Sequence, residues 1–189
     1  MCFWSTRAST TAGIGIRVAH VEAGLRSRDM SMPEEINRIC TDAISDLPFT
    51  TDMLAVENLR HEGVADGKIW FVGNTMIDTL RQQIGRALER PLPDGLKPGE
   101  YAVLTRTVEP MTYVPFLGLV ARSRMVLTDS GGIQEETTVL GVPCLTVRPN
   151  TERPITCEIG TNVLVGTDPR RIVDVLVNQA VTASCDVCV

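Results

Sequence analysis

The sequence predicts an α/β protein in which parallel sheets are covered by helices. Short apolar runs alternate along the chain with segments of helical periodicity. Several of the apolar runs end in glycine-containing loops, as buried strands of parallel sheets often do. The chain has 189 residues, of which 43% are hydrophobic and 22% charged, as in ordinary globular proteins. This length suits one domain or two small ones.

In the first half of the chain, the sequence predicts three strands, each followed by a helix. Pro33 followed by Glu34 and Glu35 marks a helix start, because proline suits the first turn and carboxylates favour the positive end of the helix dipole. Gly63 ends the next helical pattern. The predicted strands span 14–19, 47–50 and 69–72, and the predicted helices span 33–44, 54–61 and 76–90.

The second half continues the alternation after a turn-rich connector at residues 91–99. Local composition favours a domain boundary at this connector. The predicted strands span 101–105, 125–128, 143–147 and 162–165, and the predicted helices span 113–121, 133–140 and 170–180.

Charge and hydropathy exclude several classes of partner. The net charge of −5 would repel a phosphate backbone, so nucleic acid is not an expected partner. The uncharged run at residues 110–121 is shorter than the roughly 20 residues that cross a bilayer, so no membrane span is expected. The first residues lack the pattern of a secretory signal, and we therefore expect a cytoplasmic protein.

Six cysteines are too few for a disulfide scaffold in a chain of this length. Cys185 and Cys188 have metal-ligand spacing, but a zinc site needs four ligands and no histidine lies nearby. We therefore expect no metal or redox site at this pair.

A candidate phosphate site follows the strand predicted at residues 125–128. Ser130, Gly131 and Gly132 stand between this strand and the next helix, where glycines allow a ligand to approach the helix N-terminus. Such a turn can also merely reverse the chain. Two acids follow, Glu135 and Glu136, and one of them could accept hydrogen bonds from ribose hydroxyls, which favours a nucleotide site.

A second candidate site follows the first predicted strand. His20, Glu22 and Arg26 come just after the strand end, and Glu34 and Glu35 begin the following helix. Paired acids in unlike environments are what proton removal and return require. The alternatives are that one of the two helix acids only complements the helix dipole and that His20 is structural. Arg148 and Arg153 near another strand end add guanidinium groups that match phosphate oxygens.

Several motifs resemble the non-hydrolysing UDP-N-acetylglucosamine 2-epimerases. The first-domain motifs are residues 18–26 (VAHVEAGLR) and 32–38 (MPEEINR). The second-domain motifs are residues 127–136 (LTDSGGIQEE), 141–143 (GVP) and 151–154 (TERP), and residues 71–78 (FVGNTMID) match the link between the domains. The motifs occur in the family's order and span roughly residues 11–175.

The resemblance implies a glycosyltransferase-B-like pair of Rossmann-like domains, here residues 1–78 and 79–189. It implies interconversion of UDP-N-acetylglucosamine and UDP-N-acetylmannosamine by elimination and re-addition of UDP, without metal or nicotinamide. The UDP-sugar would be the substrate, and the two domains would face each other across one crevice.

Roles follow by position from the same resemblance. Glu22 and Glu34 would be the acid/base carboxylates, and His20, Arg26 and Arg38 would shape the sugar pocket. The diphosphate would bind Ser130, Gly131 and Gly132, the ribose would bind Glu136, and Arg148 would contact phosphate or sugar. Glu35 and Glu135 would be dipole and surface groups, and the role of residues 151–154 stays open.

The sequence departs from the family pattern in two places. Family members are about twice as long, and residues 1–10 have no counterpart in them. A helix-strand-helix-strand block is missing near residues 106–108, together with the histidine that normally follows that strand. Loss of a strand from the middle of a parallel sheet would leave backbone groups unpaired, at about 1–3 kcal/mol for each buried group. Both domains are therefore expected to be incomplete and to fold poorly unless another chain completes them.

These losses predict little or no epimerase activity for the isolated chain. The alternative is a catalytically silent remnant that binds UDP, self-associates or pairs with an intact epimerase subunit. A glycosyltransferase of similar architecture is disfavoured, because the motifs around Glu22 and Glu34 belong to the epimerase pattern.

Overall fold

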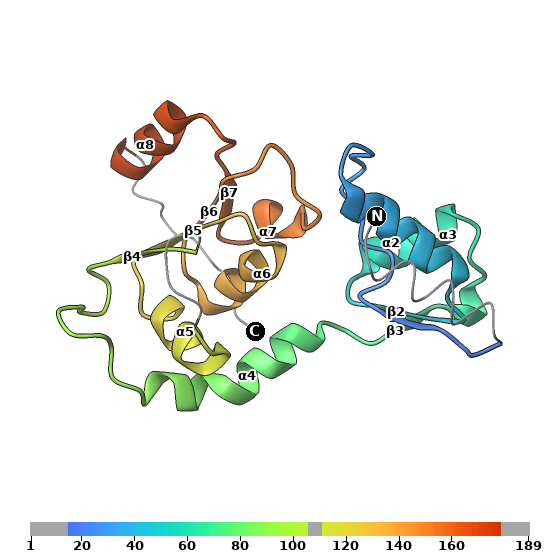
Figure 1. Cartoon of the computed structure of the whole chain (residues 1–189), viewed down its shortest axis with the longest axis horizontal. Helices are drawn as coiled ribbons and strands as arrows, with labels where there is room; N and C mark the ends of the chain where they lie inside the picture. The colour runs from blue at the N-terminus through green and yellow to red at the C-terminus, as the bar shows by residue number, and fades with distance from the viewer. Residues whose placement is uncertain (1–14, 106–110, 179–189) are drawn as a thin grey trace. The chain divides into compact units, whose positions relative to one another are not determined.

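The computed structural model describes residues 15–105 and 111–178. The chain divides into two compact units, Met1–Thr75 and Met76–Val189, and each is an α/β structure with a parallel sheet (Figure 1). The predicted fold class is therefore confirmed at this level. The turn-rich connector at residues 91–99 lies inside the second unit.

The first unit is a sheet with strand order β1-β2-β3, all parallel. Ala19 pairs with Leu47, and Phe49 pairs with Trp70. The elements are β1 (Ala19–Val21), α2 (Pro33–Ile44), β2 (Leu47–Thr50), α3 (Met53–His61), a short 3-10 helix η1 (Asp66–Lys68) and β3 (Trp70–Phe71). The predicted helix at 33–44 and strand at 47–50 are confirmed.

The helices of the first unit begin for local reasons. Pro33 stands in the first turn of α2 with Glu34 and Glu35 beside it, as the sequence predicted. Asp52 caps α3, because its carboxylate accepts a hydrogen bond from the backbone N–H of Ala55 at 2.7 Å. Helix α2 therefore begins after the loop that follows β1, and α3 begins after the loop that follows β2.

The second unit is a sheet with strand order β4-β5-β6-β7, again parallel throughout. Its strands are β4 (Ala102–Leu104), β5 (Met125–Thr128), β6 (Cys144–Thr146) and β7 (Asn162–Leu164). Its helices are α4 (Thr75–Leu88), α5 (Tyr113–Val120), α6 (Gly131–Leu140), α7 (Ile155–Glu158) and α8 (Pro169–Asn178). The sequence did not predict α7, which is only one turn long.

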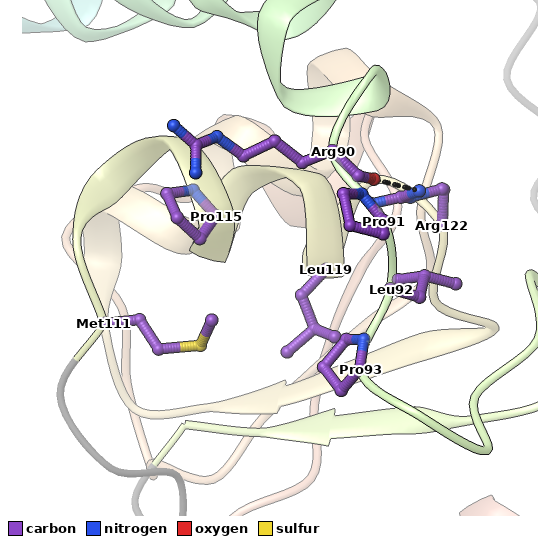
Figure 2. Close-up of a pocket in the computed structure, with 8 residues that line it drawn as sticks. All are labelled: Arg90, Pro91, Leu92, Pro93, Met111, Pro115, Leu119 and Arg122. Carbon is purple, nitrogen blue, oxygen red and sulfur yellow. Dashed lines mark hydrogen bonds between the residues drawn. The ribbon is translucent and has the colours of Figure 1, made fainter.

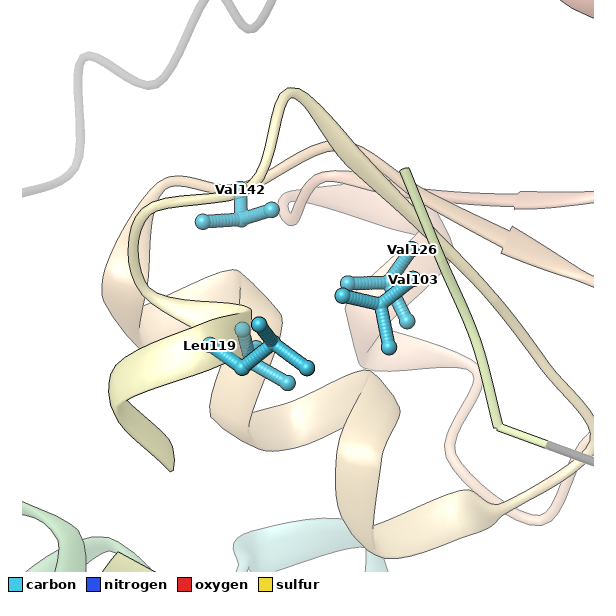
Figure 3. Packing of buried hydrophobic residues seen from close by; sticks show 5 residues of the cluster. Val103, Leu119, Val126 and Val142 are labelled. Carbon is cyan, nitrogen blue, oxygen red and sulfur yellow. The ribbon is translucent and has the colours of Figure 1, made fainter. Parts of the chain in front are cut away.

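Neighbouring residues of β5 point to opposite faces of this sheet. On one face, Val126 packs with Val103, Val142 and Leu119 of α5, as Figure 3 shows. On the other face, Leu127 packs with Leu145, Val165 and Val175, so α8 covers that side. Both faces of the central strands are therefore buried under apolar helices.

Helix α4 belongs to the second unit by its packing. Leu80 and Ala87 of α4 form a buried cluster with Leu117 of α5. Gly118 lets the two helices approach, because a Cβ at this position would collide with the backbone oxygen of Ala87. The break between the units lies after Thr75, the first residue of α4, three residues before the end predicted for the first domain at residue 78.

The expectation of a gap in the middle of the second sheet is wrong. β4 pairs directly with β5, with Ala102 opposite Met125 and Leu104 opposite Leu127. Because β4 stands at the end of the strand order, the four strands that the structure describes form one continuous sheet.

Three sequence predictions lie outside the described residues. They concern residues 1–10, the deletion near 106–108, and the pair Cys185 and Cys188. Within residues 15–105 and 111–178, no helix is long and apolar enough to cross a bilayer. The same residues hold no group of three or more His, Cys, Asp or Glu side chains that could bind a metal.

Candidate functional site

A sharp turn at the carboxyl end of β1 carries Glu22. Its φ is +67°, a left-handed conformation that costs a non-glycine residue energy. Gly24 follows at φ +82°, and a Cβ there would collide with the backbone oxygen of Ala55. The N–H of Ala23 is held by the carbonyl of Phe49 in β2 at 3.0 Å. The turn thus fixes the backbone position of the half-buried Glu22.

Buried charges hold the loop around this turn. Asp42 of α2 is 4% exposed, and its carboxylate contacts His20 Nδ1 at 2.5 Å and Arg26 Nη2 at 2.7 Å. The same carboxylate accepts a hydrogen bond from the N–H of Gly24 at 3.0 Å. Arg26 also binds Glu62 through Nε and Nη2. Neither Asp42 nor Glu62 was a sequence candidate, and only their spatial position reveals them.

The predicted roles of His20 and Arg26 can be compared with this network. The guanidinium of Arg26 is already bound by Asp42, Glu62 and the carbonyl of Leu25. It is 8% exposed and stabilises the loop from within. The side chain of His20 is 20% exposed and has one ring nitrogen on Asp42. His20 is therefore held in place yet accessible to a ligand.

The two acids at the start of α2 have different environments. Glu34 is exposed. Glu35 is 1% exposed and accepts hydrogen bonds from Ser27, the N–H of Arg28 and the guanidinium of Arg38. The prediction that Glu35 is a surface group is wrong, because it organises the loop at residues 27–28.

Burial alone would raise the pKa of Glu35. The hydrogen bonds from Ser27, Arg38 and Arg28 outweigh burial, so the pKa of this carboxyl lies below its usual value. Arg38, predicted to shape the sugar pocket, makes its ion pair with Glu35 at 2.9 Å. Glu35 is thus an ionised anchor for Arg38.

The predicted phosphate site is the N-terminus of α6. Ser130 is the residue before this helix, and Gly131 and Gly132 form its first turn. The side chain of Ser130 does not cap the helix. The N–H groups at the start of a helix have no partner within it, and the helix dipole makes them attractive to an anion. The structure therefore brings Ser130, Gly131 and Gly132 together in the arrangement that the sequence predicted.

Glu136 lies more than one turn further along α6 and is 4% exposed. Its carboxylate accepts a hydrogen bond from the hydroxyl of Tyr113 in α5 at 3.0 Å. Burial raises the pKa of Glu136, although the Tyr113 hydrogen bond opposes this. Burial and the nearby Glu136 charge raise the pKa of Tyr113 to about 12. Tyr113 was not a sequence candidate, although it would hold Glu136 in position.

The neighbouring acid, Glu135, is also buried, at 8% exposure. It forms an ion pair with Arg153 at 3.3 Å. The prediction that Glu135 is a surface group is therefore wrong. Its pairing joins α6 to the loop that carries the motif at residues 151–154.

Arg148 follows β6 and lies beside the same helix end. Its Nη1 contacts the carbonyl of Asp129 at 3.3 Å and the carboxylate of Glu152 at 3.1 Å. The Glu152 side chain in turn reaches Gly131, where its Oε1 lies 2.5 Å from the position a Cβ would take. Arg148 is therefore placed next to the predicted phosphate site, as expected, and Glu152 is an additional charge there.

A buried polar cluster holds the loop that contains residues 151–154. The side-chain oxygen of Gln134 accepts hydrogen bonds from Thr151 at 2.7 Å and Asn162 at 3.1 Å. Gln134 is fully buried, and its Nε2 has no hydrogen-bond partner among the described residues. A helical pattern cannot reveal such a cluster, because its members come from α6, the loop and β7.

A separate hollow of about 310 Å³ lies beside α5, as Figure 2 shows. Leu92, Pro115 and Leu119 contribute to its apolar wall, and the carbonyl of Arg90 accepts a hydrogen bond from Arg122 at 2.9 Å. None of the residues that line this hollow is a predicted site residue.

Comparison with known proteins decides the family. The family model described as UDP-N-acetylglucosamine 2-epimerase matches residues 5–107 and 99–184. The chain belongs to the UDP-N-acetylglucosamine 2-epimerase family. The two matched stretches overlap at residues 99–107, next to the missing block that the sequence predicts. The first stretch includes residues 5–10, so the expectation that residues 1–10 have no counterpart in the family is wrong for that part. The fold is therefore the expected glycosyltransferase-B-like pair of parallel-sheet domains, both incomplete.

Individual relatives agree with this assignment. The chain is 32% identical to the UDP-N-acetylglucosamine 2-epimerase of Methanococcus maripaludis, over 88% of this chain and 63% of the relative. It is 34% identical to the UDP-2,3-diacetamido-2,3-dideoxy-D-glucuronate 2-epimerase of Pseudomonas aeruginosa, over 90% of this chain and 63% of that protein. The first alignment is 230 residues long, so the archaeal epimerase contains residues within the aligned region that this chain lacks.

A solved structure supports the family fold. The Methanocaldococcus jannaschii UDP-GlcNAc 2-epimerase, crystallised in complex with UDP-GlcNAc and UDP, matches with a TM-score of 0.81 and 32% identity. The match covers 92% of this chain and 66% of that one. The epimerase-family chain described here thus spans slightly less than two thirds of its curated archaeal relatives.

Proposed function

We propose that this chain binds UDP-N-acetylglucosamine and carries the epimerase chemistry of its family, with low turnover as an isolated chain. The observation that carries the proposal is the start of α6, where Ser130, Gly131 and Gly132 form an uncapped helix N-terminus beside Arg148. Partly buried helix ends of this kind bind phosphate groups through backbone N–H donors.

The second unit would hold the nucleotide. Gly131 and Gly132 place no side chain of their own over the helix start, and the Arg148 guanidinium next to it would add a positive charge for the diphosphate. Glu136 would accept hydrogen bonds from the ribose hydroxyls. Because Tyr113 already donates to this carboxylate, the carboxylate has a fixed orientation before ligand arrives.

The first unit would carry the reaction at the sugar. One carboxylate of the pair Glu22 and Glu34 takes the proton from C2, and the C1–O bond breaks with its electrons passing to the UDP oxygen. This elimination leaves a double bond between C1 and C2. Return of a proton to the opposite face of C2, with attack of UDP on C1, then gives the epimer.

The fixed backbone at Glu22 and the accessible carboxylate of Glu34 suit this work. His20, held through Nδ1 by Asp42, would contact the sugar with the rest of its ring. Arg26 and Arg38 would act mainly by holding this loop, since each already pairs with a buried carboxylate.

Low turnover follows from what the chain lacks. It spans 63% of its Methanococcus maripaludis relative, and no histidine occurs after residue 61. The second unit therefore supplies no imidazole to donate a hydrogen bond or proton to the leaving diphosphate. Stabilisation of developing charge is usually the largest part of catalysis, so loss of such a group lowers the rate most.

Calorimetric titration with UDP and uridine, together with NMR detection of UDP-N-acetylmannosamine, tests the proposal. We expect UDP to bind more tightly than uridine, because uridine lacks the diphosphate. We expect conversion of UDP-N-acetylglucosamine to be far slower than by an intact family member. Absence of UDP binding would overturn the proposed function, and turnover equal to that of the intact enzyme would overturn the impairment.

The alternative is a catalytically silent UDP-binding subunit that self-associates or pairs with an intact epimerase. The sheet edges favour it, because within the described residues β1, β3, β4 and β7 each pair with another strand on one side only. UDP binding without any turnover, and co-elution with an intact family member in size-exclusion chromatography, would support this alternative.

A further inference from the structure

Glu152 occupies space at the start of α6 that only a glycine leaves open. Its Oε1 lies 2.5 Å, and its Cδ 3.2 Å, from the position of a Cβ at Gly131. The glycine at this position is therefore needed for the carboxylate to approach the helix backbone. A negatively charged group from the chain itself thus lies against the helix end at which the diphosphate would bind.

Two positively charged groups lie beside the carboxylate of Glu152. The helix N-terminus is the positive end of the dipole, and Arg148 pairs with the other carboxylate oxygen at 3.1 Å. The side chain of Glu152 is 13% exposed and that of Arg148 is 17% exposed, so water screens the charges of this pair only in part. The carboxylate therefore neutralises the same two groups, Arg148 and the helix end, that an incoming phosphate would use.

We propose that Glu152 is an internal competitor for the phosphate site, an anion that the diphosphate of a UDP-sugar must displace from Gly131 and Arg148. This inference rests on the proposed function, since it concerns the same helix end. Two anions cannot share one helix end and one guanidinium without repulsion, so ligand binding requires the Glu152 side chain to move. Glu152 thereby sets the affinity for UDP and favours release of the bound nucleotide.

The loop around Glu152 limits this movement to the side chain. On one side, the hydroxyl of Thr151 donates to Gln134 at 2.7 Å and accepts from the N–H of Arg153 at 3.0 Å. On the other side, Arg153 is 5% exposed and pairs with Glu135. With both neighbours fixed, a rotation about the Glu152 side-chain bonds moves the carboxylate off Gly131 while the loop backbone stays in place.

Calorimetric titration of UDP and of uridine into the purified full chain tests the inference. One variant is E152Q, which removes the negative charge and keeps the shape of the side chain. The other is E152A, which removes the whole carboxylate group. The control is E158Q, because Glu158 is an exposed carboxylate of the same unit and lies in α7. Thermal unfolding of each variant verifies that it is folded before it is titrated.

We expect UDP to bind E152Q and E152A about tenfold more tightly than the original chain, a change of about 1.4 kcal/mol. Uridine affinity should not change, because uridine carries no anion, and E158Q should bind UDP as the original chain does. If the original chain binds UDP and both Glu152 variants bind it equally or more weakly, the inference is wrong while the proposed function stands. If none of the proteins binds UDP, the proposed function and the inference both fail.

Discussion

The two units differ in the extent of their apolar packing. In the second unit, apolar residues fill both faces of the sheet, and Val126, Leu127 and Leu145 are each 9% exposed or less. In the first unit, the buried residues include Arg26, Glu35 and Asp42, while Trp70 and Phe71 of β3 are 53% and 58% exposed. Both units bury ion pairs, such as Arg26 with Asp42 in the first and Glu135 with Arg153 in the second. Among the described residues, the apolar clusters lie in the second unit, so apolar packing is what distinguishes it.

This difference has a functional meaning. The charges of the first unit surround the strand-end loop that carries His20 and Glu22, so they position candidate catalytic groups rather than fill a core. Buried ion pairs contribute little net stability, but the loss of one partner is costly. The first unit should therefore be the weaker of the two and the more sensitive to single substitutions of charged residues.

The sequence provides a separate optical signal for each unit. Both tryptophans precede residue 76, and both tyrosines follow it. Tryptophan fluorescence therefore reports on the first unit. Tyrosine absorbance, after the tryptophan contribution has been subtracted from the spectrum, reports on the second. Urea unfolding followed by these two signals therefore compares the stabilities of the two units.

The largest effect is expected from D42N in the first unit. The substitution removes the charge that Arg26 and His20 share, leaving a buried guanidinium short of one partner. The first unit should lose about 3–5 kcal/mol of its free energy of unfolding. Urea unfolding followed by tryptophan fluorescence measures this loss. D66N, which breaks an exposed pair with Arg60, is the control and should cost less than about 1 kcal/mol.

A somewhat smaller effect is expected from L145A in the second unit. Leu145 is fully buried and packs with Leu127, Val165 and Val175, so truncation leaves a cavity. The second unit should lose about 3 kcal/mol. The tyrosine signal should shift to lower urea concentration and the tryptophan signal should not. A shift of both signals together would show that the units unfold as one.

Acidification should affect the two units in opposite directions. The pKa of Glu35 is lowered in the folded chain, so its stabilising contribution is present above its unfolded pKa, near 4.3, and is lost as the pH falls through the folded value. The pKa of Glu136 is raised, so its ionised form destabilises the second unit, and lowering the pH toward the unfolded value relieves this.

Urea-unfolding midpoints measured from roughly pH 3 to pH 7 test these opposite trends, because this range contains both carboxyl transitions. E35Q should weaken the pH dependence of the tryptophan signal, and E136Q that of the tyrosine signal. Identical pH profiles for the original chain and both variants would contradict the assigned environments.

The smallest effect is expected from D52A at the start of α3. The carboxylate of Asp52 caps the helix by accepting a hydrogen bond from the N–H of Ala55. Its removal should cost the first unit about 1 kcal/mol. D52N, which keeps an acceptor oxygen, should recover most of this loss in the same urea experiment. Equal losses for D52A and D52N would show that charge, rather than capping, is responsible.

The sequence predicted the elements better than it predicted the partners of their side chains. Apolar runs marked β5 and β6 because those residues are buried in a parallel sheet, and proline with two acids marked the start of α2. The strand predicted at 14–19 is shifted, since β1 spans Ala19–Val21 and its residues are exposed or half-buried. α6 begins at Gly131, two residues before its predicted start, because glycine lowers helix propensity although it can occupy a first turn. Periodicity also could not detect α7, which is only four residues long.

The polar partners could not be predicted, because they join residues far apart in the chain. Asp42 meets His20 across 22 positions, and Tyr113 meets Glu136 across 23. Glu35 and Glu135 were expected at the surface because charged residues usually lie there. Each is buried instead because an arginine, Arg38 or Arg153, reaches it.

The central claim is that the start of α6 binds the diphosphate of a UDP-sugar. A titration of the ¹⁵N-labelled chain with UDP, followed by amide NMR, tests it most directly. The account predicts that the largest shifts occur at Gly131, Gly132 and Ile133, and that uridine causes much smaller ones. Shifts confined to the hollow beside Pro115 and Leu119, or no shifts at all at saturating UDP, would contradict it.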